Sequence, residues 1–167
     1  MLFRSGETSG ELQCRGNWIA ATYYNDERAH ESFTKDGWLR TGDVATVDAH
    51  GRIRLVDRTK DLIKSGGEWI SSVEIENELM AHPKIKEAAV IGVTHPKWSE
   101  RPLACVVLNP GETMSKDEVL DHVRGSLAKW QVPDDVVFID EVPKTSVGKF
   151  SKKTLRERFA DYVLPES

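Results

Sequence analysis

Three polar segments of this chain combine residue types that can bind or transfer a phosphoryl group. They lie at residues 39–43, 57–70 and 143–150, each between apolar runs, where functional side chains tend to concentrate. In the first segment Gly42 permits a sharp turn, and Asp43 follows it at the mouth of a predicted strand. A carboxylate held there can accept two hydrogen bonds from adjacent hydroxyls, as on a ribose. The alternative is a turn aspartate that bonds its own backbone.

The second segment is basic and contains a Gly-Gly pair followed by a tryptophan. Arginine and lysine can neutralise phosphate, and paired glycines let a backbone approach a ligand closely. Trp69 offers a flat face to a ring or an apolar wall to a thin chain. The alternative is a basic interdomain loop with Trp69 packed as a core anchor.

The third segment ends in Gly148 and Lys149 and only superficially suggests a phosphate loop. It is not a Walker A motif, because Pro143 stands where the first glycine belongs and Phe150 where Ser or Thr belongs. A loop ending in Gly-Lys still presents one ammonium, which suits the negative charge of a phosphoryl group in transfer. The alternative is a solvated surface lysine.

Composition limits the classes of protein to consider. The net charge of -4 and the pI near 5.8 argue against binding of nucleic acid by bulk phosphate attraction. No apolar run approaches the ~20 residues of a membrane span, and nothing suggests secretion, so we expect a cytoplasmic protein without a transmembrane segment. Neither the five histidines nor Cys14 and Cys105 show metal-ligand spacing. We therefore expect no metal site in this chain, and two buried, reduced thiols.

Apolar patterning predicts a β-rich first third followed by a small α+β domain with helices packed on a short sheet. In the first part we expect two short strands within 10–21, a short helix at 26–33 and a hairpin of strands 42–47 and 52–57. Residues 59–71 lack apolar periodicity and are predicted as a loop. Beyond them we expect a helix capped at Ser71, strands at 87–94 and 103–108, a helix capped at Ser115, a strand at 136–139 and a helix from Ser151 through Tyr162.

The order and spacing of these motifs resemble the later part of the adenylate-forming superfamily, which includes acyl-CoA synthetases, luciferases and peptide-synthetase adenylation domains. The form SGGEWISS at 65–72, with Pro-Lys-Trp at 96–98 and Glu-Arg-Pro at 100–102, looks most like medium- and long-chain fatty acyl-CoA synthetases. The other motifs that carry the resemblance are Gly10-Glu11-Leu12, Asp36-Gly37-Trp38, Arg40-Thr41-Gly42-Asp43, Asp57-Arg58, Val73-Glu74-Ile75-Glu76 and Pro143-Lys144-Thr145-Ser146-Val147-Gly148-Lys149.

The resemblance implies a ligase that uses a fatty acid, ATP and CoA. The carboxylate attacks the α-phosphate of Mg-ATP to give acyl-AMP and pyrophosphate. A rotation of the small C-terminal domain then admits CoA, whose thiol gives acyl-CoA and AMP. Magnesium is expected only on the N-terminal part of such an enzyme.

Site residues carried over from the resemblance fall into three groups. Lys149 matches the catalytic lysine that enters the site for adenylation, and Lys60 falls at the hinge. The nucleotide-binding residues would be Asp43, Arg58, Lys60, Lys64 and Trp69. The residues lining the pantetheine tunnel for CoA would be Ser65, Gly66 and Gly67.

The resemblance also divides the chain. Residues 1–57 would be a remnant of the large N-terminal domain, 58–61 the hinge and 62–167 the mobile C-terminal domain. The family's Ser/Thr/Gly-rich phosphate loop, its magnesium-holding segment and its acyl pocket have no counterpart in this sequence. We therefore expect a fragment that is inactive alone and whose partner is the missing N-terminal domain. A homodimer of the full protein stays open.

Several other functions stay open at this point. An aryl or short-chain acid–CoA ligase would share the same motifs. A peptide-synthetase adenylation domain is disfavoured because no carrier domain follows residue 167. Outside catalysis, the alternatives are a stand-alone nucleotide- or CoA-binding module and an inert gene fragment.

Overall fold

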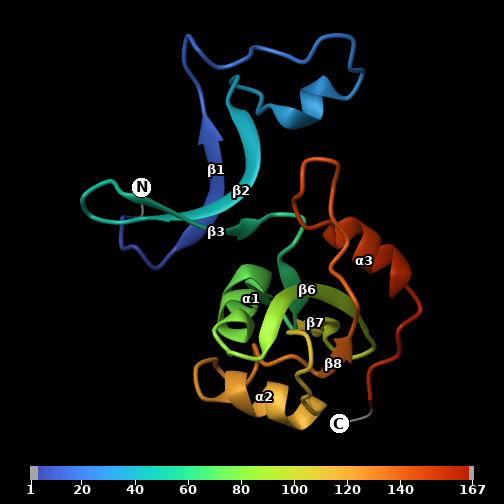
Figure 1. Cartoon of the computed structure of the whole chain (residues 1–167). Helices are drawn as coiled ribbons and strands as arrows, with labels where there is room; N and C mark the ends of the chain where they lie inside the picture. Colours follow the sequence, from blue (N-terminus) through green and yellow to red (C-terminus); the bar gives the residue numbers. More distant parts are fainter. Residues whose placement is uncertain (1–3, 166–167) are drawn as a thin grey trace. The chain divides into compact units, whose positions relative to one another are not determined.

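The computed structural model describes residues 4–165 and consists of two compact units, residues 1–60 and 61–167 (Figure 1). The outermost residues of the two predicted domains, 1–3 and 166–167, lie outside the described residues. Among the described residues, no helix has the length and apolar character needed to cross a membrane. The boundary after Lys60 lies within the segment 58–61.

The first unit is built on a three-stranded antiparallel sheet in the order β1-β2-β3. Its strands are β1 (Ser9–Cys14), β2 (Leu39–Val47) and β3 (Ile53–Arg58). The predicted hairpin between the last two strands is confirmed, because Gly51 N donates to Asp48 O at 3.0 Å to close the turn. Ile53 and Leu55 remain 56% and 62% exposed, so β3 carries apolar side chains on an uncovered face.

Two predictions for the first unit are wrong. The chain forms a single strand within 10–21, because a turn in which Ile19 N donates to Gly16 O follows β1 and the partner of β1 is the distant β2. The predicted helix at 26–33 is only the 3-10 turn η1 (Ala29–Ser32). Ala29 is its one buried residue, which leaves too little apolar face to stabilise an α-helix.

The second unit is confirmed as an α+β domain with helices packed on a short sheet. The sheet has the order β5-β4-β7-β6, and β8 pairs in parallel with β7. Its long central hairpin consists of β6 (Ile85–His95) and β7 (Ser99–Leu108), and β8 (Asp135–Phe138) follows later in the chain. Figure 1 shows α1 (Ser72–Met80), α2 (Lys116–Arg124) and α3 (Lys152–Arg158) around this sheet.

Both faces of the β6–β7 hairpin are covered, which explains its continuous apolar runs. Val90 and Val106 belong to a core shared with α1 and α2, whereas their neighbours Ile91 and Cys105 belong to a second core that includes Leu155 of α3. Alternate residues of a strand point to opposite faces, so both sets must be apolar here. Cys105 is buried as predicted, while Cys14 is only partly buried.

The starts of the helices at Ser71 and Ser115 agree with the predicted caps, whereas the predicted end of the last helix does not agree with the structure. The Ser71 and Ser115 side chains accept hydrogen bonds from the backbone N–H groups of Glu74 and Glu118. The last helix is shorter than predicted, because α3 ends at Arg158 and Tyr162 lies beyond it.

The structure adds a hairpin that the sequence did not predict. Strands β4 (Ile63–Ser65) and β5 (Glu68–Ile70) occupy part of the predicted loop at 59–71. Each has only three residues, too few to show an alternating pattern. The buried side chains of Ile63 and Ile70 hold the hairpin on the core.

A buried carboxylate fixes the end of the described chain to this unit. Asp135 accepts hydrogen bonds from Lys116 Nζ at 2.7 Å, from Val136 N at 2.7 Å and from the Tyr162 hydroxyl at 2.5 Å. Burial raises the pKa of Asp135, but these three donors outweigh it and hold the pKa below its ordinary value. Burial and the hydrogen bond to Asp135 raise the pKa of Tyr162 to about 12.

Candidate functional site

In the first unit, Asp43 and Arg58 lie opposite each other on adjacent strands. They are paired in the β2–β3 register, and Arg58 Nε lies 3.3 Å from Asp43 Oδ1. The Asp43 side chain is 34% exposed to solvent, so its carboxylate can still accept hydrogen bonds from a ligand. The structure thus brings together two of the predicted nucleotide-binding residues.

The backbone around Asp43 is held from two sides. Thr41 Oγ1 donates to Leu12 O at 2.8 Å and accepts from Asp43 N at 3.1 Å, which ties this part of β2 to β1. Thr59 N donates to Gly42 O at 2.8 Å. The carboxylate therefore projects from a rigid strand, and the alternative of a turn aspartate does not apply. Lys60 is exposed in the turn after β3, at the unit boundary.

In the second unit, Gly66 and Gly67 form the two-residue turn of the β4–β5 hairpin. Their φ angles of +60° and +94° fit a turn that needs positive φ at both central positions, where glycine is favoured. Gly66 also packs tightly, because a Cβ there would lie 2.6 Å from Trp98 Cε3. No atom lies within 4 Å of a Cβ built at Gly67, so that position is open.

Lys64 and Trp69 face each other across the same hairpin. They are register partners, and Lys64 Nζ lies 5.0 Å from the centre of the Trp69 ring. Trp69 is 51% exposed, so the alternative that it is a buried core anchor is wrong. The pair presents a ring face and an ammonium on the same surface.

Arg101 organises the wall next to this hairpin. Its guanidinium donates to Asp134 Oδ1 from Nε and Nη2, to Ser65 Oγ and Trp130 O from Nη1, and to Val132 O from Nη2. These five hydrogen bonds, at 2.6–3.0 Å, use all five N–H donors of the side chain. Arg101 is therefore a structural cation with no donor left for a ligand.

A cavity of about 470 Å³ lies beside the hairpin turn. Ser65 and Gly66 are on its edge, and the rings of Trp98 and Trp130 line it together with Lys129. Lys129 is exposed, and its ammonium makes no hydrogen bond or ion pair with the described residues. Of the predicted CoA-binding residues, Gly67 does not line this cavity.

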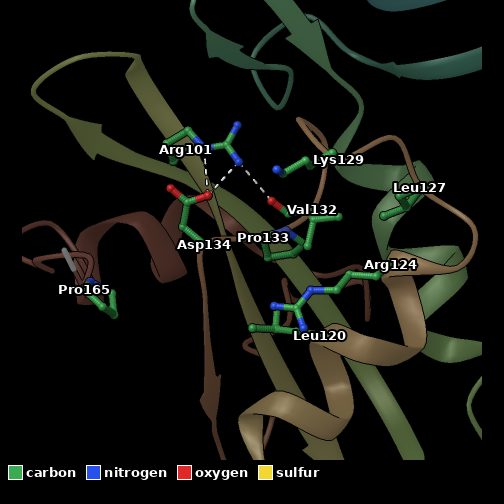
Figure 2. A pocket seen from close by; sticks show the side chains of 9 residues that line it. All are labelled: Arg101, Leu120, Arg124, Leu127, Lys129, Val132, Pro133, Asp134 and Pro165. Carbon is green, nitrogen blue, oxygen red and sulfur yellow. Dashed lines mark hydrogen bonds and ion pairs between the residues drawn. The ribbon is translucent and has the colours of Figure 1, made fainter. Parts of the chain in front are cut away.

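A second cavity, of about 690 Å³, shares Arg101, Lys129 and Asp134 with the first (Figure 2). Figure 2 shows the Arg101–Asp134 pair at one end and Arg124 of α2 further along. The two cavities together form a partly apolar surface around residues 124–134 that also carries Arg124 and Lys129, with Glu68 and Asp134 in its lining.

Lys149 lies on a short hairpin that projects between β8 and α3. Thr145 N donates to Lys149 O at 2.7 Å, and Lys149 N donates to Thr145 Oγ1 at 3.2 Å. The lysine is exposed, and its ammonium makes no hydrogen bond or ion pair with any described residue. The loop is thus ordered by its backbone while its cation stays free.

Comparison with known proteins assigns the family. The family described as the AMP-binding enzyme C-terminal domain matches residues 74–149. The long-chain-fatty-acid–CoA ligase of Thermus thermophilus is 52% identical over 161 residues, covering 95% of this chain. This chain belongs to the AMP-binding, adenylate-forming enzyme family. The 3-methylmercaptopropionyl-CoA ligase of Ruegeria pomeroyi is 53% identical over 158 residues, again 95% of this chain.

Solved structures of the same family share the fold. The ATP-bound MatB of Rhodopseudomonas palustris is 35% identical, covers 93% of this chain and superposes with a TM-score of 0.86. The chain spans about 30% of the length of the two ligases above and 31% of the MatB chain.

Sequence reasoning gave no role to Arg101, Trp98, Lys129 or Trp130. Arg101 and Trp98 stood in motifs that carried the family resemblance, but nothing in the sequence showed that the arginine reaches Ser65 and the loop after α2. Lys129 and Trp130 are adjacent and lie between apolar elements. The same signal, a cation or a ring in a segment between apolar runs, singled out the three polar segments of the sequence analysis.

Proposed function

We propose that this chain is the C-terminal part of a fatty acid–CoA ligase, which joins a fatty acid to CoA through an acyl-adenylate at the expense of ATP. The observation that carries the proposal is the 52% identity to a long-chain-fatty-acid–CoA ligase across 95% of the chain. The geometry supports it, because the motif residues present free cations and an accessible carboxylate at ordered positions.

Asp43 would bind the ribose hydroxyls of the nucleotide. Arg58 Nε, at 3.3 Å, orients the Asp43 carboxylate and leaves its remaining lone pairs to accept hydrogen bonds from the diol. As the resemblance implies, Lys64 and Trp69 would also contact the nucleotide, the ring by stacking and the ammonium by charge. Lys60 would contact the nucleotide too and, at the unit boundary, would be the hinge about which the units reorient.

Lys149 would stabilise the negative charge that builds on carboxylate and phosphate oxygens during adenylation. Because its ammonium has no partner among the described residues, no contact with them must break before it engages the phosphate, and an ordered loop lowers the entropic cost of placing it. Its removal should therefore slow acyl-adenylate formation rather than unfold the domain.

CoA would enter along the β4–β5 hairpin. The pantetheine arm is thin, and the lack of a side chain at Gly67 leaves room for it at the hairpin turn, whereas the Trp98 ring fills the corresponding space at Gly66. Trp98 and Trp130 would supply apolar or stacking surface in the adjoining cavity, and Lys129 a cation for phosphate. Arg101 would shape this site without touching the ligand.

As the resemblance implies, magnesium bound with ATP would be held by the N-terminal part of such an enzyme. No group of three or more His, Cys, Asp or Glu side chains among the described residues could hold a metal ion.

The proposal can be tested in a chimera in which this chain replaces the matching C-terminal part of the Thermus thermophilus ligase. We expect palmitate-dependent AMP formation with ATP and CoA, and its loss in Lys149→Ala. A stable chimera without turnover, or one indifferent to Lys149→Ala, would contradict the proposal and favour a non-catalytic binding module or an inert fragment. The chain alone should release no pyrophosphate from ATP and palmitate above a Lys149→Ala control.

A short-chain acid is the second candidate substrate, because the 3-methylmercaptopropionyl-CoA ligase of Ruegeria pomeroyi is equally similar. A second chimera with that ligase as host distinguishes the two. Because each host supplies the acyl pocket, full turnover only with the Thermus host would show that this C-terminal part is matched to a fatty acid ligase, whereas full turnover only with the Ruegeria host would show that it is matched to a short-chain acid ligase.

A further inference from the structure

A buried ion pair joins the start of α3 to α1. Lys152 Nζ lies 2.7 Å from Glu76 Oε1, and the two side chains are only 11% and 9% exposed. The same ammonium donates to Ser72 Oγ at 2.7 Å. The same carboxylate oxygen accepts from Val90 N of β6 at 2.7 Å. Lys152 therefore connects three elements through one set of charge-assisted hydrogen bonds.

Net stability alone is a weak reason for such a pair. Removing two charges from water is costly, and apolar residues of similar volume often stabilise a core equally well. A buried pair does, however, restrict geometry, because each charge must meet its partner at hydrogen-bond distance. In this unit it restricts where the first residue of α3 can lie.

That residue stands three positions after Lys149, at the base of the hairpin that carries it. Ser151 N donates to Pro143 O at 2.7 Å, so the two limbs of the hairpin meet beside Lys152. The other limb is attached by Lys144, whose Nζ lies 2.7 Å from Glu87 Oε1. Lys144 is 45% exposed and Lys152 only 11%, so water screens the first attachment more than the second.

We propose that Lys152, through Glu76, is a positioning residue for Lys149: the buried pair fixes the base of the hairpin and so the place of the adenylating ammonium. This inference rests on the proposed function, in which Lys149 acts in acyl-adenylate formation. Lys152 itself touches no substrate. Because Lys149 would serve only the first half-reaction, loss of Lys152 should impair adenylation and spare thioester formation.

The test uses the Thermus chimera and measures the two half-reactions separately, as pyrophosphate release and as acyl-CoA formation from supplied acyl-adenylate. In Lys152→Met we expect adenylation to fall about 10- to 100-fold, as expected for a displacement near 1 Å. Thioester formation should stay within about threefold of the parent. Lys152→Arg should recover most of the loss. The matched control is Lys153→Met, because Lys153 is a neighbouring lysine whose side chain is 81% exposed.

Lys152→Met leaves Glu76 buried without this cation, which could weaken the fold itself. The double variant Glu76→Gln/Lys152→Met removes both charges and keeps an oxygen for Val90 N. It should show the same selective loss of adenylation. The positioning role would be overturned if the double variant adenylates like the parent. It would also be overturned if Lys152→Met is folded, as the parent is, but loses both half-reactions to the same extent.

A second readout needs no activity. In the 167-residue chain, Lys152→Met should speed hydrogen exchange at the bonded amides of Thr145 and Gly148, and Lys153→Met should not. Unchanged exchange would also overturn the inference. If the parent chimera fails to adenylate or ignores Lys149→Ala, the proposed function fails. If those controls behave as expected and Lys152→Met adenylates normally, the positioning role alone fails.

Discussion

Replacing Arg101 by Met should destabilise the second unit strongly. The substitution keeps much of the side-chain volume but removes five hydrogen bonds, two of them to Asp134. Breaking a buried ion pair by removing one partner costs about 3–5 kcal/mol. The Asp134 side chain is 23% exposed and water can partly replace the arginine, so we expect the lower end, about 3 kcal/mol.

The loss is large enough to measure and small enough to leave the unit folded. For a domain of about 100 residues, 1 kcal/mol corresponds to roughly 4–8 °C in Tm, so Arg101→Met should lower the Tm by at least about 10 °C. Urea unfolding followed by tryptophan fluorescence should give the free energy of unfolding directly. The matched control is Arg124→Met, which removes an arginine that is 53% exposed and should change stability by less than about 0.5 kcal/mol.

A free energy of unfolding for Arg101→Met within about 1 kcal/mol of the parent would refute this reasoning, because it would show that the buried pair only offsets its own desolvation. In the chimera the same substitution should impair thioester formation more than adenylation, since Arg101 supports the wall of the proposed CoA site. Equal loss of both half-reactions in folded enzyme would contradict that assignment.

Three further outcomes follow from particular contacts. Gly66→Ala should destabilise the β4–β5 hairpin more than Gly67→Ala, because both have positive φ but only Gly66 would place a Cβ 2.6 Å from the Trp98 ring; equal Tm values for the two variants would contradict this. The low pKa of Asp135 adds stability that is complete above its unfolded value near 4 and is lost as pH falls through the lower folded value, so Asp135→Asn should flatten the acid limb of the stability curve. Urea unfolding midpoints from pH 2 to pH 7 measure this dependence of stability on pH. If the stability of Asp135→Asn falls with acid as steeply as that of the parent, the prediction is wrong. The Tyr162 hydroxyl should ionise only near pH 12, seen as an absorbance change at alkaline pH that Tyr162→Phe lacks; ionisation near pH 10 would show that the bond to Asp135 is absent in solution.

The parts of the fold that could be predicted are those in which local signals and packing agree. The apolar runs of β6 and β7 are long enough to indicate strands, and Ser71 and Ser115 cap helices by contacts within one turn. The β4–β5 hairpin could not be predicted in this way, because three-residue strands carry no periodicity and two buried isoleucines from opposite ends hold it in place. The partner of β1 depends on a contact across about thirty residues, which no local pattern reveals.

The residues of the candidate site also fall into those that a local motif indicates and those whose role depends on distant partners. Asp43 and Lys149 could be singled out from the sequence because each sits in a short motif, and the resemblance to the family supplied their expected roles. Arg101 and Lys152 gained their roles only from the structure, since their partners lie 33 and 76 positions away in the sequence. A short motif can indicate that a residue has a functional role, whereas the residue's hydrogen-bond and ion-pair partners in the fold determine what that role is.

Hydrogen-bond satisfaction separates the cations of this chain into two kinds with different expected phenotypes. The ammonium groups of Lys129 and Lys149 have no partner among residues 4–165, so removing either should change a kinetic or binding constant while leaving the free energy of unfolding close to that of the parent. The side chains of Arg101 and Lys152 are themselves largely buried and hydrogen-bonded, so their removal should lower stability and affect the reaction only through the elements that they fix. Measuring stability and both half-reactions for all four alanine or methionine variants therefore tests the assignment of each cation. A large stability loss in Lys149→Ala would place that lysine in the wrong class.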